Sequence, residues 1–255
     1  MTSFPTKEHE IACNKFVEIF RQDKRIKSIL VNCSCARGKA TKDSCLDLVL
    51  IIKEDKYYNL IENKFKRLKK SVKEFIDLKK VGKYSHIDLQ ITTGKIIPKP
   101  RDWTSGPDEY ELEIGNIFRY SKLLFDKKGY FKKLSKKYLP YYSEKVRKKK
   151  LVGVLGYMNN NLDHIEIYVK RGLYFHAFSR FYSALREFLQ ALFISKKIYP
   201  IAYDKHIKEQ FYDILKMPKF YEEYKHLYEI KKIESEELIE KTKKLKELSK
   251  KYIQK

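Results

Sequence analysis

Apolar residues dominate two short segments near the start of the chain, Ile26–Val31 and Leu46–Ile52. Short runs of this kind, rich in aliphatic side chains and bounded by polar residues, are typical of buried strands. A third segment, residues 86–93, alternates between aliphatic and polar residues, which is the pattern of a strand with one face buried. We therefore predict a small sheet built from these three segments.

Longer segments with apolar residues every three or four positions flank the predicted strands and indicate helices. Residues 7–22 show an amphipathic pattern, and residues 55–76 show a longer, lysine-rich one. Residues 111–126 are expected to form a helix and a last strand that ends at Asp126. The proline- and glycine-rich residues 94–110 are predicted to form a loop.

The second half of the chain has the helical period throughout. Residues 151–169 and 177–192 carry continuous apolar stripes and predict a packed helix hairpin. Further helices are expected over residues 203–215, 219–230 and 234–254. A turn after Asp126 separates this half from the predicted sheet, so we predict two domains, residues 1–127 and residues 128–255.

Asp47 lies inside the second apolar run. An ionised carboxylate in a strand is costly to bury unless a cation or hydrogen-bond donors meet it. The segment that connects the two strands supplies hydroxyl groups, positive charge and one permissive backbone position, with Ser34, Arg37, Gly38 and Ser44 among its residues. This combination suits the binding of phosphate groups.

The segment from residue 31 to residue 50, VNCSCARGKATKDSCLDLVL, resembles the signature of the polymerase-β-like nucleotidyltransferase superfamily. In that signature a Gly-Ser pair, often followed by Ala-Arg-Gly, precedes a strand with the pattern Ser-Asp-x-Asp. The matching positions of this chain are Ser34, Ala36, Arg37, Gly38, Ser44 and Asp47. The resemblance implies an α+β fold, with an N-terminal domain that has a small mixed sheet and flanking helices.

The resemblance also implies the roles of the site residues. Asp47 matches the second of two paired aspartates that bind metal, and Asp88, on the polar face of the third strand, matches a third carboxylate. Ser34, with the neighbouring Arg37, Gly38 and Ser44, matches the nucleotide-binding positions. The implied cofactor is Mg²⁺ or Mn²⁺, and the implied substrate is a nucleoside triphosphate.

Two positions depart from the signature. Cys33 stands where the glycine of the Gly-Ser pair is expected, and Cys45 stands where the first paired aspartate is expected. A thiol is a poor ligand for Mg²⁺, which prefers hard oxygen donors. Three interpretations follow: the site binds a nucleotide without turnover, it works with fewer or different metal ions, or Asp43 replaces the missing catalytic carboxylate if the strand begins early enough.

Residues 171–200 resemble a second element of this superfamily, the all-α C-terminal helical bundle that accompanies antibiotic nucleotidyltransferases of the aminoglycoside and lincosamide type. The shared pattern is a glycine-aromatic helix start, a long aromatic helix and a Tyr-Pro end. Residues 1–127 are thus expected to be nucleotidyltransferase-like and residues 128–255 to be the helical bundle.

The predicted function is transfer of a nucleoside monophosphate from a nucleoside triphosphate to an acceptor hydroxyl, with metal assistance. The alternative is a catalytically inactive homologue that acts as a nucleotide-binding or regulatory module. The acceptor is open among a small molecule, a protein and RNA, and a homodimer is compatible with the sequence. A third hypothesis is RNA cleavage, because the spacing of Arg171 and His176 resembles the Arg-x4–6-His ribonuclease motif of proteins in which a helical domain accompanies a minimal nucleotidyltransferase domain.

A formal net charge of +23 suggests an anionic partner, but the scatter of lysines through nearly every segment favours solvated surface residues over a nucleic-acid-binding surface. No segment has the length of apolar residues that crosses a membrane, and the N-terminus lacks a secretory pattern, so a cytoplasmic location is expected.

Cysteines occur only at positions 13, 33, 35 and 45. Buried thiols are the plainest interpretation, while a soft-metal site or a disulfide among the last three stays open.

Overall fold

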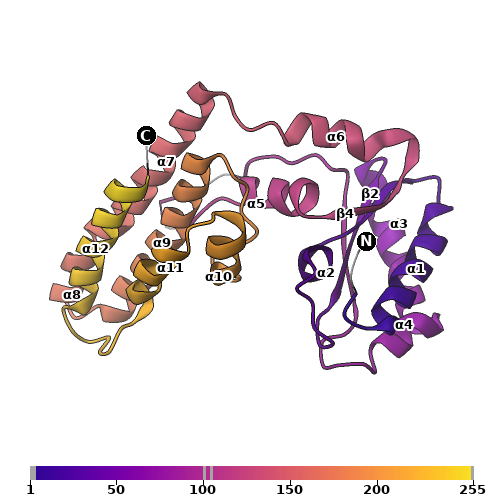
Figure 1. Ribbon diagram of the computed structural model, residues 1–255, viewed down its shortest axis with the longest axis horizontal. Helices are drawn as coiled ribbons and strands as arrows, with labels where there is room; N and C mark the ends of the chain where they lie inside the picture. The colour runs from indigo at the N-terminus through magenta and orange to yellow at the C-terminus, as the bar shows by residue number, and fades with distance from the viewer. Residues whose placement is uncertain (1–3, 100–101, 104–105, 254–255) are drawn as a thin grey trace. The chain divides into compact units, whose positions relative to one another are not determined.

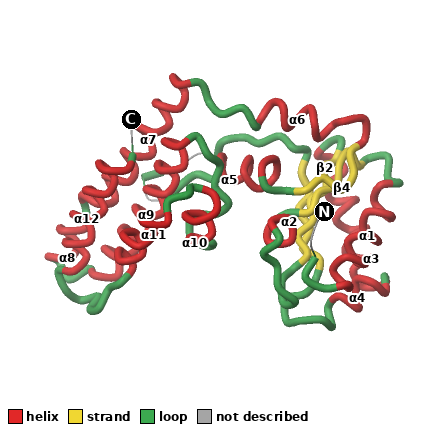
Figure 2. The backbone as a smooth tube through the Cα atoms, in the orientation of Figure 1, coloured by secondary structure: helices red, strands yellow, loops and turns green. Residues whose placement is uncertain are grey.

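The chain divides into two compact units in a computed structural model that describes residues 4–99, 102–103 and 106–253. The first, here called the sheet unit, comprises Met1–Ile97 and Glu113–Pro140. The second, here called the helical unit, comprises Pro98–Leu112 and Tyr141–Lys255. Figures 1 and 2 show a mixed sheet with flanking helices in the first unit and helices alone in the second, so the predicted α+β fold is confirmed.

The sheet has four strands in the order β3-β2-β1-β4. Its strands are β1 (Ile26–Val31), β2 (Leu46–Ile52), β3 (Ile87–Thr92) and β4 (Lys122–Asp126), which agree with the four predicted strands. Strand β1 is antiparallel to both β2 and β4, whereas β2 and β3 are parallel. A parallel pair needs a crossover connection, and the helices that follow β2 provide it.

One face of the sheet is covered by α1 (Lys7–Arg21), α3 (Tyr58–Ser71) and α4 (Lys73–Leu78), which lie together on one side of it in Figure 1. Their aromatic residues form a buried core with alternate residues of the strands; the fully or nearly fully buried rings are Phe16, Phe20, Phe65 and Phe75. This face therefore supplies the main hydrophobic stabilisation of the unit.

The opposite face of the sheet is covered by helix α6 (Tyr130–Tyr138). The ring of Phe118 stacks on both Phe131 and Tyr138 of this helix, with ring centroids 5.6 and 4.9 Å apart. Phe118 belongs to a five-residue π-helix, Gly115–Arg119, between the short helix α5 (Tyr110–Ile114) and β4. The helix and strand predicted over residues 111–126 are thus present.

The single helix predicted over residues 55–76 is wrong, because the segment is broken into a 3₁₀ turn (Asp55–Tyr57), α3 and α4. Val72 separates the two α-helices with an extended backbone, φ −80° and ψ 120°. The break has a packing reason: it lets Phe75 and Leu78 of α4 enter the same core as Ile61 and Phe65 of α3.

The helical unit is built around two long helices, α7 (Glu144–Asp163) and α9 (Tyr174–Lys196), as the predicted hairpin requires. Their apolar stripes share one core with the remaining elements of the unit. Those elements are α8 (Ile165–Lys170), α10 (Ile207–Glu209), a π-helix (Gln210–Ile214), α11 (Pro218–Lys225), a 3₁₀ turn (His226–Tyr228) and α12 (Glu237–Tyr252). The predicted first helix of the hairpin is interrupted at His164, which links α7 to α8.

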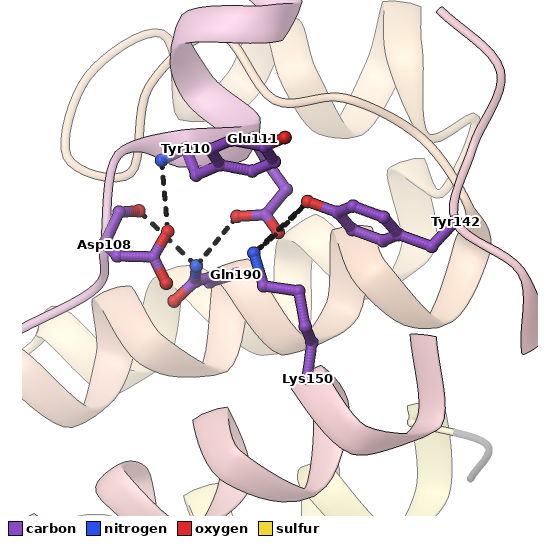
Figure 3. A network of polar contacts seen from close by, with 6 residues as sticks. All are labelled: Asp108, Tyr110, Glu111, Tyr142, Lys150 and Gln190. Atoms are coloured by element: carbon purple, nitrogen blue, oxygen red, sulfur yellow. Dashed lines mark hydrogen bonds and ion pairs between the residues drawn. The ribbon is translucent and has the colours of Figure 1, made fainter. Parts of the chain in front are cut away.

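A polar network fixes residues 108–112 within the helical unit (Figure 3). The Glu111 carboxylate accepts hydrogen bonds from Tyr142 Oη at 2.8 Å and Gln190 Nε2 at 3.0 Å, and it forms an ion pair with Lys150 at 2.5 Å. The Glu111 side chain is only 1% exposed, so all three partners are needed to offset the cost of burying its charge.

The two spatial units are not continuous in sequence. Residues 98–112 belong with the helices, and residues 128–140 belong with the sheet because α6 packs on it. The sequence instead divided the chain once, after residue 127. The domain limits 1–127 and 128–255 stay a prediction.

No helix in the part of the chain that the structure describes has the length and apolar character needed to span a membrane.

Candidate functional site

Two carboxylates are brought together at the edge of the sheet. In the parallel register of β2 and β3, Asp47 pairs with Asp88. Both line a pocket of about 190 Å³, and its other lining residues are Asn32, Cys33, Leu48, Val49, Leu89 and Gln90. The two residues predicted to bind metal therefore open onto the same small cavity, one from each strand.

The alternation of β2 explains why Asp47 points away from the main core. Leu46, Leu48 and Leu50 lie in the core beneath α1, α3 and α4. Successive residues of a strand point to opposite faces, so Asp47 lies on the other face, where it is half-buried. Asp88 is exposed on the neighbouring strand.

A short helix, α2 (Cys33–Arg37), occupies part of the segment that connects β1 to β2, where no helix was predicted. Asn32 caps it, since the side-chain carbonyl of Asn32 accepts a hydrogen bond from the Cys33 backbone N–H at 2.7 Å. Gly38 ends the helix with a left-handed φ of 70°, a conformation that glycine adopts without strain. The glycine predicted as a permissive backbone position thus serves as the C-terminal cap.

Cys33 has a left-handed backbone as well, with φ +53°. A residue with a side chain is disfavoured there by roughly 1–2 kcal/mol. The signature that this segment resembles has glycine at this position, and glycine adopts such a backbone conformation more readily than cysteine. The strain lies directly on the pocket, because Cys33 lines it.

Cys45 is engaged with Asp47. The Cys45 thiol donates to Oδ2 of Asp47 at a distance of 3.3 Å. Burial, followed by the negative charge of Asp47, raises the pKa of the Cys45 thiol to about 12. The thiol is therefore protonated at neutral pH and acts as a hydrogen-bond donor, whereas a metal ligand would have to be a thiolate.

Asp43 lies apart from the carboxylate pair. Strand β2 begins at Leu46, so Asp43 sits in the preceding turn, where its carboxylate accepts a hydrogen bond from the Lys83 backbone N–H at 3.2 Å. A Cβ atom on Gly82 would lie 2.5 Å from the Asp43 carboxylate, which shows how tightly the two segments approach. The early strand start on which the Asp43 hypothesis depended does not occur.

The remaining predicted residues surround α2 and do not line the pocket. Ser34 and Arg37 belong to α2 and are half-buried, and Gly38 follows them. Ser44 closes a turn, in which its hydroxyl accepts a hydrogen bond from the Thr41 backbone N–H at 2.9 Å. The nucleotide-binding roles of these four residues stay predictions.

Two residues that shape the site were missed by the sequence analysis. Asn32 lines the pocket and caps α2. His9, fully buried in α1, bonds the Ser44 carbonyl through Nε2 at 2.9 Å and Thr6 Oγ1 through Nδ1 at 2.9 Å, which fixes the segment before Cys45. An asparagine immediately after a strand and before a short polar helix is a capping signal that local sequence could have revealed.

The residues at the pocket fit one hard divalent cation. Among the described residues, no group of three or more histidine, cysteine, aspartate or glutamate side chains is arranged to hold a metal. Mg²⁺ is commonly held by only one or two protein carboxylates together with substrate phosphates and water. Asp47 and Asp88 meet that requirement, whereas a two-metal arrangement would need the carboxylate that Cys45 replaces.

All four cysteines are free thiols in the structure. Cys13 and Cys35 are buried, and burial raises the pKa of each thiol to about 12. They behave as small apolar core residues in this environment.

The residues behind the RNA-cleavage hypothesis lie on the surface of the helical unit. Arg171 and His176 are both exposed, and the His176 ring packs edge-on against Tyr168 at a centroid distance of 4.5 Å. No contact between Arg171 and His176 is found among the described residues.

The geometry agrees with the comparisons with known proteins. Residues 13–105 match a family model described as a nucleotidyltransferase domain. A crystal structure of a nucleotidyltransferase-like protein from Exiguobacterium sibiricum 255-15 aligns with 95% of this chain and 74% of its own, at 12% identity and a TM-score of 0.46. No curated protein sequence matches the chain. The segment that matches the nucleotidyltransferase domain model contains β1, α2, β2 and β3, so the similarity covers the strands that position Asp47 and Asp88.

Proposed function

We propose that the sheet unit binds a nucleoside triphosphate through a divalent cation on Asp47 and Asp88 and transfers its nucleoside monophosphate to an acceptor hydroxyl. One observation carries this proposal: the parallel register pairs Asp47 with Asp88, and both line one pocket. The cavity of about 190 Å³ is smaller than most sites for whole ligands, which suits a cation with phosphate oxygens rather than an entire nucleotide.

The protein groups have separate tasks in this proposal. Asp47 and Asp88 would hold Mg²⁺ or Mn²⁺, which would act as a Lewis acid on a phosphate oxygen. Ser34 and the backbone around Gly38 would contact the triphosphate, and Arg37 would offset its negative charge. The thiol of Cys45, by donating to Asp47, keeps that carboxylate oriented along the strand.

A second candidate, an inactive homologue that binds nucleotides without turnover, is favoured by the state of Cys45. Its protonated thiol occupies the position of a metal-binding carboxylate and donates to Asp47. A carboxylate that accepts from a thiol binds a cation less readily, because the donor competes for the same oxygen. The two candidates share the nucleotide site and differ only in the chemical step.

The test is release of labelled pyrophosphate from a mixture of the four nucleoside triphosphates with Mg²⁺ or Mn²⁺ and a short RNA oligonucleotide as acceptor. Wild type is compared with Asp47→Asn, Asp88→Asn and Cys45→Asp. Asp43→Asn is the matched control, since Asp43 is an exposed aspartate two residues from Cys45 that lies outside the pocket.

Activity in wild type that disappears in Asp47→Asn and Asp88→Asn, but not in Asp43→Asn, supports the transferase. Activity that appears only in Cys45→Asp supports the inactive homologue. Loss of activity in Asp43→Asn would instead revive the hypothesis that Asp43 replaces the missing carboxylate. The identity of the acceptor, a homodimer and a cytoplasmic location stay predictions.

A further inference from the structure

An exposed aromatic pair lies on the surface of the helical unit. Trp103, the only tryptophan of the chain, is 58% exposed, and its ring lies 4.7 Å from the ring of Tyr157 on α7 at an interplanar angle of 45°. Single exposed aromatic side chains are common on protein surfaces, but two rings in contact form a small exposed aromatic patch. An exposed pair of this kind offers a face on which a planar ring can stack.

The face of α7 beside this pair is bare. Gly153 and Gly156 lie one turn apart with Tyr157 and Asn160, and we call these four residues the glycine face. A Cβ atom built on either glycine would meet no described atom within 4 Å. Glycine weakens a helix interior relative to alanine, and the packing of the described residues gives no reason for glycine at either position.

A buried guanidinium reaches the same face from α9. Arg180 is 7% exposed; its Nη2 donates to the Asn160 carbonyl oxygen at 3.2 Å and lies 3.3 Å from Nδ1 of His164. Its buried Nε–H has no partner among the described residues. A buried donor without a partner is destabilising, and guanidinium groups bind phosphate through two parallel hydrogen bonds. Arg180 therefore provides a site for an anion at the end of the glycine face.

The charge of α7 agrees with an anionic ligand. Between Glu144 and Asp163 the helix contains no acidic residue, while its first two turns contain several basic ones. Lys149 is exposed one turn before Gly153, on the side of the glycine face. The basic side chains of α7 attract a phosphate backbone and repel a cationic ligand.

We propose that the helical unit binds single-stranded nucleic acid on this surface, with a base stacked on Trp103 and Tyr157, the sugar-phosphate chain along the glycine face and a phosphate at Arg180. Stacking on aromatic rings combined with basic side chains is the usual basis of single-strand binding without sequence preference. A role of the bound strand as the acceptor of the nucleoside monophosphate would rest on the proposed transferase function.

The test is the fluorescence of Trp103, the sole tryptophan, during titration of the full-length protein with a twelve-nucleotide single-stranded RNA, without nucleoside triphosphate or metal. Stacking should quench this fluorescence. Anisotropy of the same RNA carrying a fluorescein label gives the affinity, and Trp103→Ala should weaken it at least about tenfold.

Gly156→Leu separates a binding role from a structural one. The substitution replaces glycine by a good helix former in open space, so it should raise the thermal unfolding temperature while it weakens RNA binding about tenfold or more. Asn159→Leu is the matched control, because Asn159 is an exposed residue of α7 on a different side of the helix, and its RNA affinity should be unchanged. Arg180→Gln should weaken RNA binding. It should also make the slope of log affinity against log salt concentration less steep by the amount that corresponds to about one phosphate contact.

The proposal would be overturned if Trp103→Ala and Gly156→Leu both bind RNA with wild-type affinity. It would also be overturned if RNA fails to quench Trp103 fluorescence and the wild-type protein is instead a dimer that Gly156→Leu dissociates. The result is independent of the transferase site: Asp47→Asn should bind RNA with wild-type affinity. RNA binding without nucleotidyl transfer to the bound RNA would leave this proposal standing and refute only the idea that the bound strand is the acceptor.

Discussion

Glu111 in the helical unit and Asp47 in the sheet unit are both carboxylates beneath the protein surface, but their surroundings differ. Glu111 is almost fully buried and is bound by Lys150, Tyr142 and Gln190. Asp47 is half-buried on a pocket beside a second carboxylate, Asp88, and receives a weak hydrogen bond from the Cys45 thiol.

The difference shows how burial and hydrogen-bond partners distinguish a carboxylate that stabilises the fold from a carboxylate that is a candidate metal ligand. Three donors around Glu111 compensate its charge within the protein, so the network stabilises the fold and leaves no oxygen for a ligand. Two carboxylates that share a pocket repel each other, and a cation would relieve that repulsion. Substitution of Glu111 should therefore lower the stability of the protein, whereas substitution of Asp47 should lower its affinity for a metal ion and leave its stability nearly unchanged.

The largest effect is expected from Glu111→Ala, which leaves Lys150 in a partly buried position without its ion-pair partner. Loss of one member of a buried pair typically lowers the free energy of unfolding by about 3–5 kcal/mol. Urea denaturation measures it. Glu109→Ala, which removes only an exposed pair with Lys99, is the control and should cost less than about 1 kcal/mol. A loss below about 1 kcal/mol in Glu111→Ala would contradict a structural role for the network.

The next effect is expected from Asp47→Asn, which removes a charge from the carboxylate pair. The affinity for Mn²⁺ in the presence of a nucleoside triphosphate should fall about 100-fold, while the unfolding free energy stays within about 1 kcal/mol of wild type or rises. Isothermal titration calorimetry and urea denaturation give the two quantities. Unchanged Mn²⁺ affinity together with a large loss of stability would place Asp47 in the same class as Glu111.

A smaller effect is expected in the chemistry of Cys45. Its thiol has a pKa of about 12, raised from an ordinary value of about 9, so at pH 9 only a small fraction is thiolate. Alkylation by iodoacetamide, which needs the thiolate, should therefore stay slow at pH 9 and rise as the pH increases towards 12. Asp47→Asn removes a charge that raises this pKa and should speed alkylation of Cys45 at pH 9 about tenfold, measured by peptide mass spectrometry. Equal rates in the two proteins would show that Asp47 does not control the thiol.

The smallest effect is expected from Cys33→Gly, which removes a side chain from a left-handed backbone position. The free energy of unfolding should rise by about 1 kcal/mol, because glycine adopts this conformation without strain. Thermal unfolding measures it, with Cys13→Ala, a buried cysteine in regular helix, as a comparison that should lower stability. A loss of stability in Cys33→Gly would mean that contacts of the Cys33 side chain outweigh the backbone strain.

Local hydrophobic patterns predicted the strands well where one face of the strand is buried. The two apolar runs became β1 and β2 with the predicted limits, and the alternating segment became β3. The prediction failed where a single residue changes the backbone: Val72 divides the expected long helix into α3 and α4, and Asn32 turns the expected simple connection into α2. Helical periodicity continues across such a break, so the pattern alone does not reveal it.

The sequence by itself determined the resemblance to the nucleotidyltransferase signature, the α+β division and the choice of the two candidate metal-binding residues, because strand period and signature spacing are local properties. Only the tertiary structure decided that Asp47 and Asp88 are neighbours, that Asp43 is held in a turn by Lys83, and that Glu111 is buried. These facts depend on strand register and on contacts between residues far apart in the chain. Such contacts are set by the packing of the whole unit and leave no local pattern around any one of the residues.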